Sequence, residues 1–198
     1  MNVLTGAGSG KVLQSNSDDH VFVLFFDHGG AGVIAFPGGT LHKSELQTAL
    51  QSMHDKTMYK KLTFYMEACE SGSMFQGMNI PGVYAVSTSN PTESSWGTYC
   101  GSDAVVNGKN LNTCLGDLFS VNWMEDSVAE DVTKESPSTQ YNTVREKTTK
   151  SAVMQWSDTS FTSDMVSDYL GTTGSTFIDA AEDTAKSAVY VRQLIEHA

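Results

Sequence analysis

The chain has 198 residues, of which 39% are hydrophobic and 18% are charged, and 23 Asp and Glu residues outnumber 12 Lys and Arg residues. This length and apolar content are sufficient for one globular domain with a hydrophobic core. The formal net charge of −11 disfavours non-specific attraction to nucleic acids and to anionic membranes. The longest unbroken apolar run, Val21 to Phe26, is far shorter than the roughly 20 residues that cross a bilayer, so no transmembrane helix is expected.

The first half of the chain predicts strands separated by one helix. The continuous apolar run from His20 to Phe26 is typical of a strand that is buried on both faces. Ser44 opens a Ser-x-x-Gln capping box, and the helical spacing of the following apolar residues predicts a helix that ends near residues 60–61. The apolar face of this helix consists of Leu46, Ala49, Leu50 and Met53. Two further strands are expected at residues 62–66 and 83–87.

The second half predicts more helix than strand. Ser136 followed by Pro137 is an N-cap and N1 pair that opens a helix. Helices are expected at residues 115–126, 136–147 and 179–197, a strand at residues 152–156 and a polar loop at residues 157–176. Since neither an internal repeat nor a second domain is recognisable, residues 1–198 are expected to form one α/β domain.

One histidine and one cysteine follow the first two strands. A strand, a helix and a strand in succession imply a right-handed βαβ unit with adjacent parallel strands. His28 follows the first strand and Cys69 the second, so both are expected at the carboxyl edge of the sheet, where open α/β sheets place their sites. Such a pair has the parts of a thiolate dyad, in which the imidazole takes up the thiol proton and the thiolate attacks a carbonyl. The alternative is a buried structural cysteine beside a histidine in a turn.

The residues beside the histidine add to the catalytic interpretation. Gly29 and Gly30 permit a close approach of substrate and backbone. The backbone N–H groups of Gly29 and Cys69 are therefore expected to converge on a developing oxyanion. Asp27 either orients the imidazole of His28 or is a turn residue, and the sequence favours neither.

The cysteines and histidines also limit disulfides and metal sites. Cys69, Cys100 and Cys114 are an odd set, so at most one intramolecular pair can form. Cys100 and Cys114 flank a polar stretch that is suitable for a surface loop closed by a disulfide, but two reduced thiols fit the spacing equally well. Neither CxxC nor HxxxH spacing occurs, so no metal site is expected, and no cofactor is indicated.

Four segments of the chain resemble the legumain family, the asparaginyl endopeptidases or vacuolar processing enzymes. They are residues 26–32 (FDHGGAG), 67–74 (EACESGSM), 90–96 (NPTESSW) and 120–127 (SVNWMEDS). The Glu-Ala-Cys-Glu-Ser-Gly-Ser motif is highly specific, and the similarity extends from about Gly10 to near Val191. The resemblance implies a caspase-like α/β fold, with a mostly parallel sheet flanked by helices. It also implies an endopeptidase that cleaves after Asn, and after Asp at more acidic pH, with His28 as the base and Cys69 as the nucleophile.

The resemblance further implies which residues bind substrate. By motif position, Glu67 and Asp117 match the acidic residues of the pocket for the P1 side chain, the residue on the amino side of the cleaved bond. Ser94, Ser95 and Trp96 match the segment that runs along the substrate. An Asn side chain presents two N–H donors, which suits carboxylate acceptors. Glu67 and Asp117 have an alternative interpretation, as an ordinary strand-end acid and an ordinary helix-cap acid.

The resemblance also bears on the loop, the partners and the location. Cys100 and Cys114 match a cysteine pair of plant-type legumains that brackets a proline-rich loop beside the active site, which implies a disulfide, although this chain has no proline between them. The implied partners are peptide or protein substrates and cystatin-type inhibitors. The implied location is a vacuole or lysosome.

Some features of the family are not recognised in residues 1–198. These are two strands before residue 20, one with an Asn that orients the histidine and one with an Arg for the P1 pocket, and the C-terminal inhibitory prodomain. Residues 1–6 lack the basic and apolar regions of a signal peptide. The expectation is a partial legumain-type peptidase domain, with an exposed edge on its first strand.

Two alternatives to a hydrolytic protease remain open. An amine instead of water can resolve a thioester at Cys69, which would make the protein an asparaginyl peptide ligase or transpeptidase. A truncated, non-catalytic remnant would keep His28 and Cys69 by descent alone.

Overall fold

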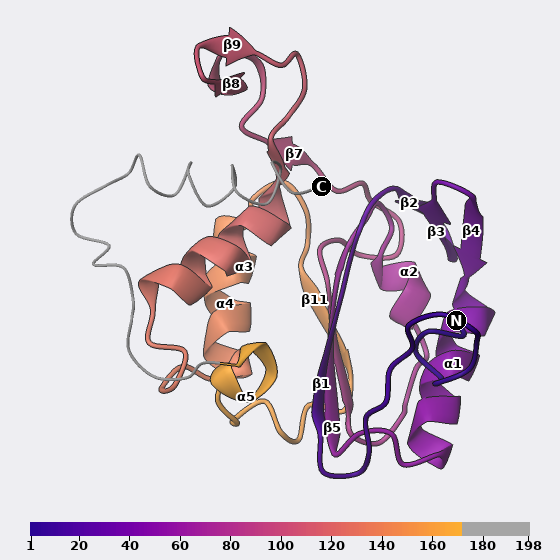
Figure 1. Ribbon diagram of the computed structural model, residues 1–198. Helices are drawn as coiled ribbons and strands as arrows, with labels where there is room; N and C mark the ends of the chain where they lie inside the picture. Colours follow the sequence, from indigo (N-terminus) through magenta and orange to yellow (C-terminus); the bar gives the residue numbers. More distant parts are fainter. Residues whose placement is uncertain (172–198) are drawn as a thin grey trace.

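The computed structural model describes residues 1–171, and a four-stranded sheet lies at its centre (Figure 1). The strands are β1 (His20–Phe26), β5 (Lys61–Glu67), β6 (Val83–Ser87) and β11 (Met154–Ser157), in the order β1-β5-β6-β11. The first three are parallel, and β11 is antiparallel to β6. Helices cover both faces, with α1 (Lys43–Asp55) and α2 (Gly72–Phe75) on one side of the sheet. The predicted α/β class, with a mostly parallel sheet flanked by helices, is confirmed.

The crossover from β1 to β5 contains the predicted helix and also a small sheet that the sequence did not reveal. Its strands are β2 (Gly29–Gly30), β3 (Val33–Phe36) and β4 (Gly39–His42), which pair antiparallel. Helix α1 follows directly and buries the four predicted apolar residues. Its N-cap is His42, and the backbone N–H of His42 donates to Glu45 Oε2 at 2.9 Å. The capping box therefore starts at His42, and the predicted capping box at Ser44 is wrong. The helix also ends earlier than predicted, because Thr57 has a left-handed backbone (φ 53°).

Alternation along β5 divides the core between the two faces of the sheet. Leu62, Phe64 and Met66 pack on the side of α1, and Tyr65 packs in a second cluster with residues of α3 (Leu118–Ala129). Because successive side chains of a strand point to opposite faces, Glu67 lies on the same face as Tyr65. The last residue of β5 is therefore a carboxylate facing α3.

Strand β1 is less buried than the sequence predicted. Of its seven residues only Val21 is buried, and Phe26 is 62% exposed. Within residues 1–171 no strand pairs with its outer side, so β1 is an edge of the described sheet. Val23 and Phe25 pack on the core of one face, and Phe22 and Leu24 pack on the core of the other, but all four are only partly buried. The strand therefore contacts the core with both faces, as predicted, and is less buried than predicted because it lies at the edge of the described sheet.

The second face of the sheet is covered by α3, α4 (Pro137–Lys147) and α5 (Ser167–Leu170). Ser136 caps α4 by accepting from the Thr139 N–H at 3.1 Å, with Pro137 at the first helical position, as predicted. Helix α3 begins later than predicted because β10 (Gly116–Asp117) pairs with β7 (Gly97–Thr98). The helix predicted at residues 179–197 lies outside the described residues.

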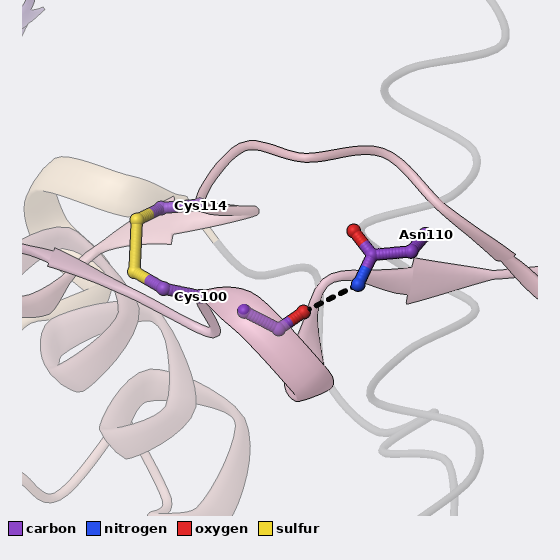
Figure 2. Close-up of a disulfide and its surroundings, with 4 residues drawn as sticks. Cys100, Asn110 and Cys114 are labelled. Atoms are coloured by element: carbon purple, nitrogen blue, oxygen red, sulfur yellow. Dashed lines mark hydrogen bonds between the residues drawn. A yellow bond between two sulfur atoms is a disulfide. The ribbon is translucent and has the colours of Figure 1, made fainter.

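The structure contains a disulfide between Cys100 and Cys114, the pair that the family resemblance implied. It closes a lobe that projects from the body of the molecule (Figure 1). The lobe contains a short 3-10 helix at Gly101–Asp103 and a hairpin of β8 (Val105–Val106) and β9 (Lys109–Asn110). Figure 2 shows the bridge together with the Asn110 side chain, which donates to the Gly101 carbonyl at 2.7 Å. Among the helices of residues 1–171, none has the length and apolar content to span a membrane.

Two carboxylates are buried together on the α3 side of the core. Asp126 is 2% exposed and Glu135 is 8% exposed. Lys147 Nζ lies 3.7 Å from Asp126 Oδ1, while Asp126 Oδ2 and Glu135 Oε2 have no hydrogen-bond partner in the part of the chain that the structure describes. Burial, followed by the negative charge of Asp126, raises the pKa of Glu135.

We predict that this pair makes the fold less stable as the pH rises. A carboxyl with a raised folded-state pKa binds more protons in the folded than in the unfolded state, so stability is lost above its unfolded pKa of about 4.3. In Glu135→Gln, the fall in Tm between about pH 5 and pH 8 should be smaller than in the parent by roughly 2–4 °C. Calorimetry of both proteins checks this, with the exposed Glu146→Gln as the matched control. An equal fall in all three proteins would contradict it.

Candidate active site

The register of β1 and β5 places His28 and Cys69 at the same edge of the sheet. Phe26 is paired with Glu67, and the Asp27 N–H extends the ladder by donating to the Glu67 carbonyl at 3.2 Å. His28 and Cys69 each follow this last pair by two residues. They therefore emerge side by side at the carboxyl ends of neighbouring parallel strands.

Gly29 allows the two turns to touch. A Cβ atom at this position would lie 2.6 Å from the Cys69 carbonyl oxygen and 2.9 Å from Ala68 Cβ, which is closer than any side chain tolerates. Residue 29 must therefore be glycine for the turn after β1 to pack on the turn after β5.

Both backbone polar groups of His28 are hydrogen-bonded. Its carbonyl accepts from the Ala35 N–H at 2.9 Å, and the neighbouring turn is held to α2 because the Gly32 N–H donates to Ser73 Oγ at 2.7 Å. Asp27 Oδ1 accepts from the backbone N–H of His28 at 2.7 Å. Asp27 is thus a turn residue here. The His28 side chain is exposed.

The Cys69 turn has an unusual backbone. Glu70 adopts a left-handed conformation (φ 54°), which is unfavourable for a residue with a side chain. The Glu70 N–H donates to the Glu93 carbonyl at 2.7 Å, and Glu93 Oε1 in turn accepts from the Ala152 N–H at 2.6 Å. These contacts hold the turn open, with Cys69 half-buried and its Sγ 3.7 Å from Ser95 Oγ.

Two buried serines, Ser71 and Ser89, make hydrogen bonds that hold the Cys69 turn. The Ser71 N–H donates to Ser89 Oγ at 3.1 Å, and the Ser89 N–H donates to Ser71 Oγ at 3.2 Å. Ser89 Oγ also donates to the Ala68 carbonyl at 3.1 Å. The sequence patterns did not indicate that Ser89, Ser73 or Glu93 is part of the site. The only sequence signal for the serines is the abundance of small polar residues after the second and third strands, where a buried strand end needs hydrogen-bond partners.

Glu67 is a buried acid with one satisfied oxygen. Its side chain is 1% exposed, and Oε2 accepts from the Ser120 N–H at 2.8 Å and from Ser120 Oγ at 3.1 Å. Oε1 has no hydrogen-bond partner within residues 1–171, because the Thr88 hydroxyl is close enough to lower the pKa of Glu67 but does not reach hydrogen-bonding geometry. Burial outweighs these contacts and raises the pKa of Glu67 to about 7.

Asp117 lies at the start of α3 without capping it. It occupies the N-cap position, but its side chain makes no capping hydrogen bond and is half-buried. Burial raises the pKa of Asp117, the nearby His28 lowers it to a smaller extent, and Asp27 raises it further, so Asp117 lies near both residues. The interpretation of Asp117 as an ordinary helix cap is therefore not supported.

The predicted substrate segment lies between the cysteine and this acid. Ser95 is half-buried beside Cys69, Ser94 is exposed, and Trp96 is 53% exposed. The Trp96 carbonyl accepts from the Leu118 N–H at 2.9 Å, which places the segment next to Asp117. All the predicted site residues thus gather at one end of the sheet. Within residues 1–171 there is no group of three metal-ligating side chains.

Comparisons with known proteins give one solved structure and several curated relatives that match this chain. Caspase-1 of Spodoptera frugiperda matches in structure with a TM-score of 0.49 and 14% identity, over 70% of this chain and 60% of that chain. The vacuolar-processing enzyme of Vicia sativa is 42% identical over 93% of this chain and 40% of its own length. Legumain of Homo sapiens is 44% identical over 84% of this chain and 37% of its own length.

These relatives confirm the resemblance to legumains that the four motifs indicated. The chain spans about two fifths of the length of the curated relatives it matches. The model of the Peptidase C13 family matches residues 1–172, which is most of the chain. The chain therefore belongs to the Peptidase C13 family.

Proposed function

We propose that this protein is a cysteine endopeptidase that cleaves peptide bonds after Asn and, at more acidic pH, after Asp. Residues 1–198 would form one legumain-type peptidase domain. The observation that carries the proposal is the contact of the His28 and Cys69 turns across Gly29, at the carboxyl ends of β1 and β5. A thiol and an imidazole on adjoining turns are the parts of an activated nucleophile.

The reaction uses the two side chains in sequence. The imidazole of His28 takes the proton of Cys69, and the thiolate attacks the carbonyl carbon of the P1 residue. The backbone N–H groups of Gly29 and Cys69 donate to the oxyanion; that of Cys69 has no partner within residues 1–171. The intermediate collapses to a thioester as protonated His28 gives its proton to the leaving amine. Water, deprotonated by His28, then releases the acid and restores the thiol.

Glu67 and Asp117 would supply the acceptors of the P1 pocket, with Ser94, Ser95 and Trp96 along the substrate. The unpartnered Oε1 of buried Glu67 supports this role, because an Asn side chain brings the N–H donors that this oxygen lacks. A P1 Asp brings a negative charge instead. It is tolerated only when Glu67, with its pKa of about 7, holds a proton.

The relatives support a location for this protein. We place the protein in a vacuole or lysosome because its relatives include vacuolar-processing enzymes and legumains. The disulfide of Cys100 and Cys114 supports a secretory route, since such bonds persist in oxidising compartments. The partners would be protein substrates and cystatin-type inhibitors.

We predict that Cys69 is an activated thiol. It is the one cysteine outside the disulfide, so alkylation reports on it alone. Iodoacetamide at neutral pH should modify it about tenfold faster than a cysteine in an unstructured peptide, because His28 stabilises the thiolate. His28→Ala should lose this advantage, and the matched variant His54→Ala should keep it. Equal rates in the parent and in His28→Ala would favour a non-catalytic remnant.

We predict selective cleavage after Asn. A peptide with a single Asn should be cut on the carboxyl side of that residue, its Gln analogue should not, and Cys69→Ser should lower kcat by about a thousandfold or more. Mass spectrometry of the products checks the position of the cut. A product joined to an added amine nucleophile would instead identify a ligase, in which the amine resolves the thioester.

We predict that Glu67 controls the pH dependence of cleavage after Asp. In the parent, the rate ratio of Asp to Asn substrates should fall as the pH rises towards about 7, since deprotonated Glu67 repels the substrate carboxylate. In Glu67→Gln the neutral amide still accepts from Ser120, so the fall should be shallower. Measuring kcat/KM for both peptides from acid to neutral pH checks this, with Glu146→Gln as the control. A slope unchanged by Glu67→Gln would refute the assignment.

A further inference from the structure

A short ladder connects the disulfide to the proposed substrate site. Strands β7 and β10 pair antiparallel, with Gly116 opposite Thr98 and Asp117 opposite Gly97. At the outer end, the Leu115 N–H donates to the Tyr99 carbonyl at 3.1 Å, and Cys100 and Cys114 follow directly. At the inner end the ladder reaches Trp96 and Asp117.

This ladder is too short to be stable by itself. Each of its strands has two residues, and even longer two-stranded ribbons are marginal in water. Its position therefore depends on the contacts around it, among them the packing of Gly116 on Val121 of α3 and the disulfide at its outer end. One such contact is made by the Tyr99 hydroxyl, which donates to Glu125 Oε1 on α3 at 2.5 Å.

The disulfide packs directly on the ladder. A Cβ atom at Gly97 would lie 2.9 Å from Cys114 Sγ and 3.0 Å from Cys114 Cβ, so the bridge occupies the space that a side chain at residue 97 would need. Gly97 is the residue opposite Asp117 and the neighbour of Trp96. Cys114 Sγ thus packs on the residue that pairs with Asp117 and follows Trp96, the two proposed substrate contacts.

The lobe beyond the disulfide is organised by its own contacts. The Asn110 side chain donates to the Gly101 carbonyl, and the Leu111 N–H donates to the Ala104 carbonyl at 2.9 Å. The lobe points away from the sheet (Figure 1). The bridge therefore lies between the base of the lobe and the ladder.

We propose that the disulfide of Cys100 and Cys114 is a positioning element for the substrate site. It clamps the ladder of β7 and β10, and thereby fixes Trp96 and Asp117 relative to Cys69. The proposal rests on the proposed function for its kinetic consequence, but its structural consequence is independent of any activity. Neither cysteine of the bridge touches the reacting atoms.

The test compares three variants of the full chain. The double variant Cys100→Ser/Cys114→Ser removes the bridge. Gly97→Ala keeps the bridge but pushes it off the ladder. Asn110→Ala is the matched control, because it removes a hydrogen bond inside the lobe and leaves both the bridge and its contact with Gly97 in place.

Amide hydrogen exchange gives the readout that needs no activity. The N–H groups of Leu115 and Leu118 should exchange about tenfold faster or more in the double variant and in Gly97→Ala, whereas the N–H of Glu70, in the Cys69 turn, should not change. Asn110→Ala should match the parent at all three positions. Two results would overturn the proposal. One is faster exchange at Glu70 as well, which would indicate general destabilisation, and the other is unchanged exchange at Leu115 and Leu118.

Kinetics with an Asn peptide give the second readout. Displacing the substrate contacts should raise KM by about tenfold, with kcat and the alkylation rate of Cys69 nearly unchanged. A loss of kcat at constant KM would overturn the positioning role. Absence of cleavage by the parent would refute the proposed function alone, since the exchange measurement would still test the clamp. If the double variant does not fold, the exchange measurement is made instead on the native parent after reduction with dithiothreitol. In this step the bridge opens to two thiols and dithiothreitol becomes a cyclic disulfide.

Discussion

The parallel pairing of β1 with β5 is the constraint on which the rest of the site depends. Its register puts Phe26 opposite Glu67, so that the chain leaves both strands at the same level and the next residues of each meet above the sheet edge. Gly29 then decides how close the two turns can come, because the Cys69 carbonyl fills the space of a side chain at that position. A one-residue slip in this register would move His28 away from Cys69 and invert the faces of β5.

Alternation along β5 has a second consequence for the chemistry. It directs Glu67 to the α3 face, where the first turn of the helix supplies the Ser120 N–H to Oε2. The positive end of a helix favours a carboxylate, whereas burial favours the protonated acid. The balance leaves a carboxyl whose pKa of about 7 lies well above that of a solvated Glu, with one oxygen free for a ligand. The same strand therefore ends in the proposed pocket acid, and the proposed nucleophile follows two residues later.

The site is built mostly from turns, and the surrounding contacts compensate for their strain. The left-handed Glu70 is held by Glu93, the Cys69 turn rests on the Ser71 and Ser89 hydroxyls, and the ladder beside Asp117 is held by the disulfide and by Tyr99. Ser89 lies 18 positions from Ser71, and Glu125 lies 26 positions from Tyr99, so these contacts join separate parts of the sequence. Strain of this kind persists only where the rest of the fold imposes it.

The sequence by itself determined the order of strands and helices around the site, the cap of α4, and the placement of His28 and Cys69 after adjacent strands, because these depend on local periodicity and on the handedness of a βαβ unit. The specific motif around Cys69 also indicated the family. Only the tertiary structure decided that α3 starts at Leu118, that Asp27 accepts from its own turn, and that Ser120 binds Glu67. Such features depend on pairings between residues far apart in the chain, about which the local pattern of apolar and polar side chains carries no information.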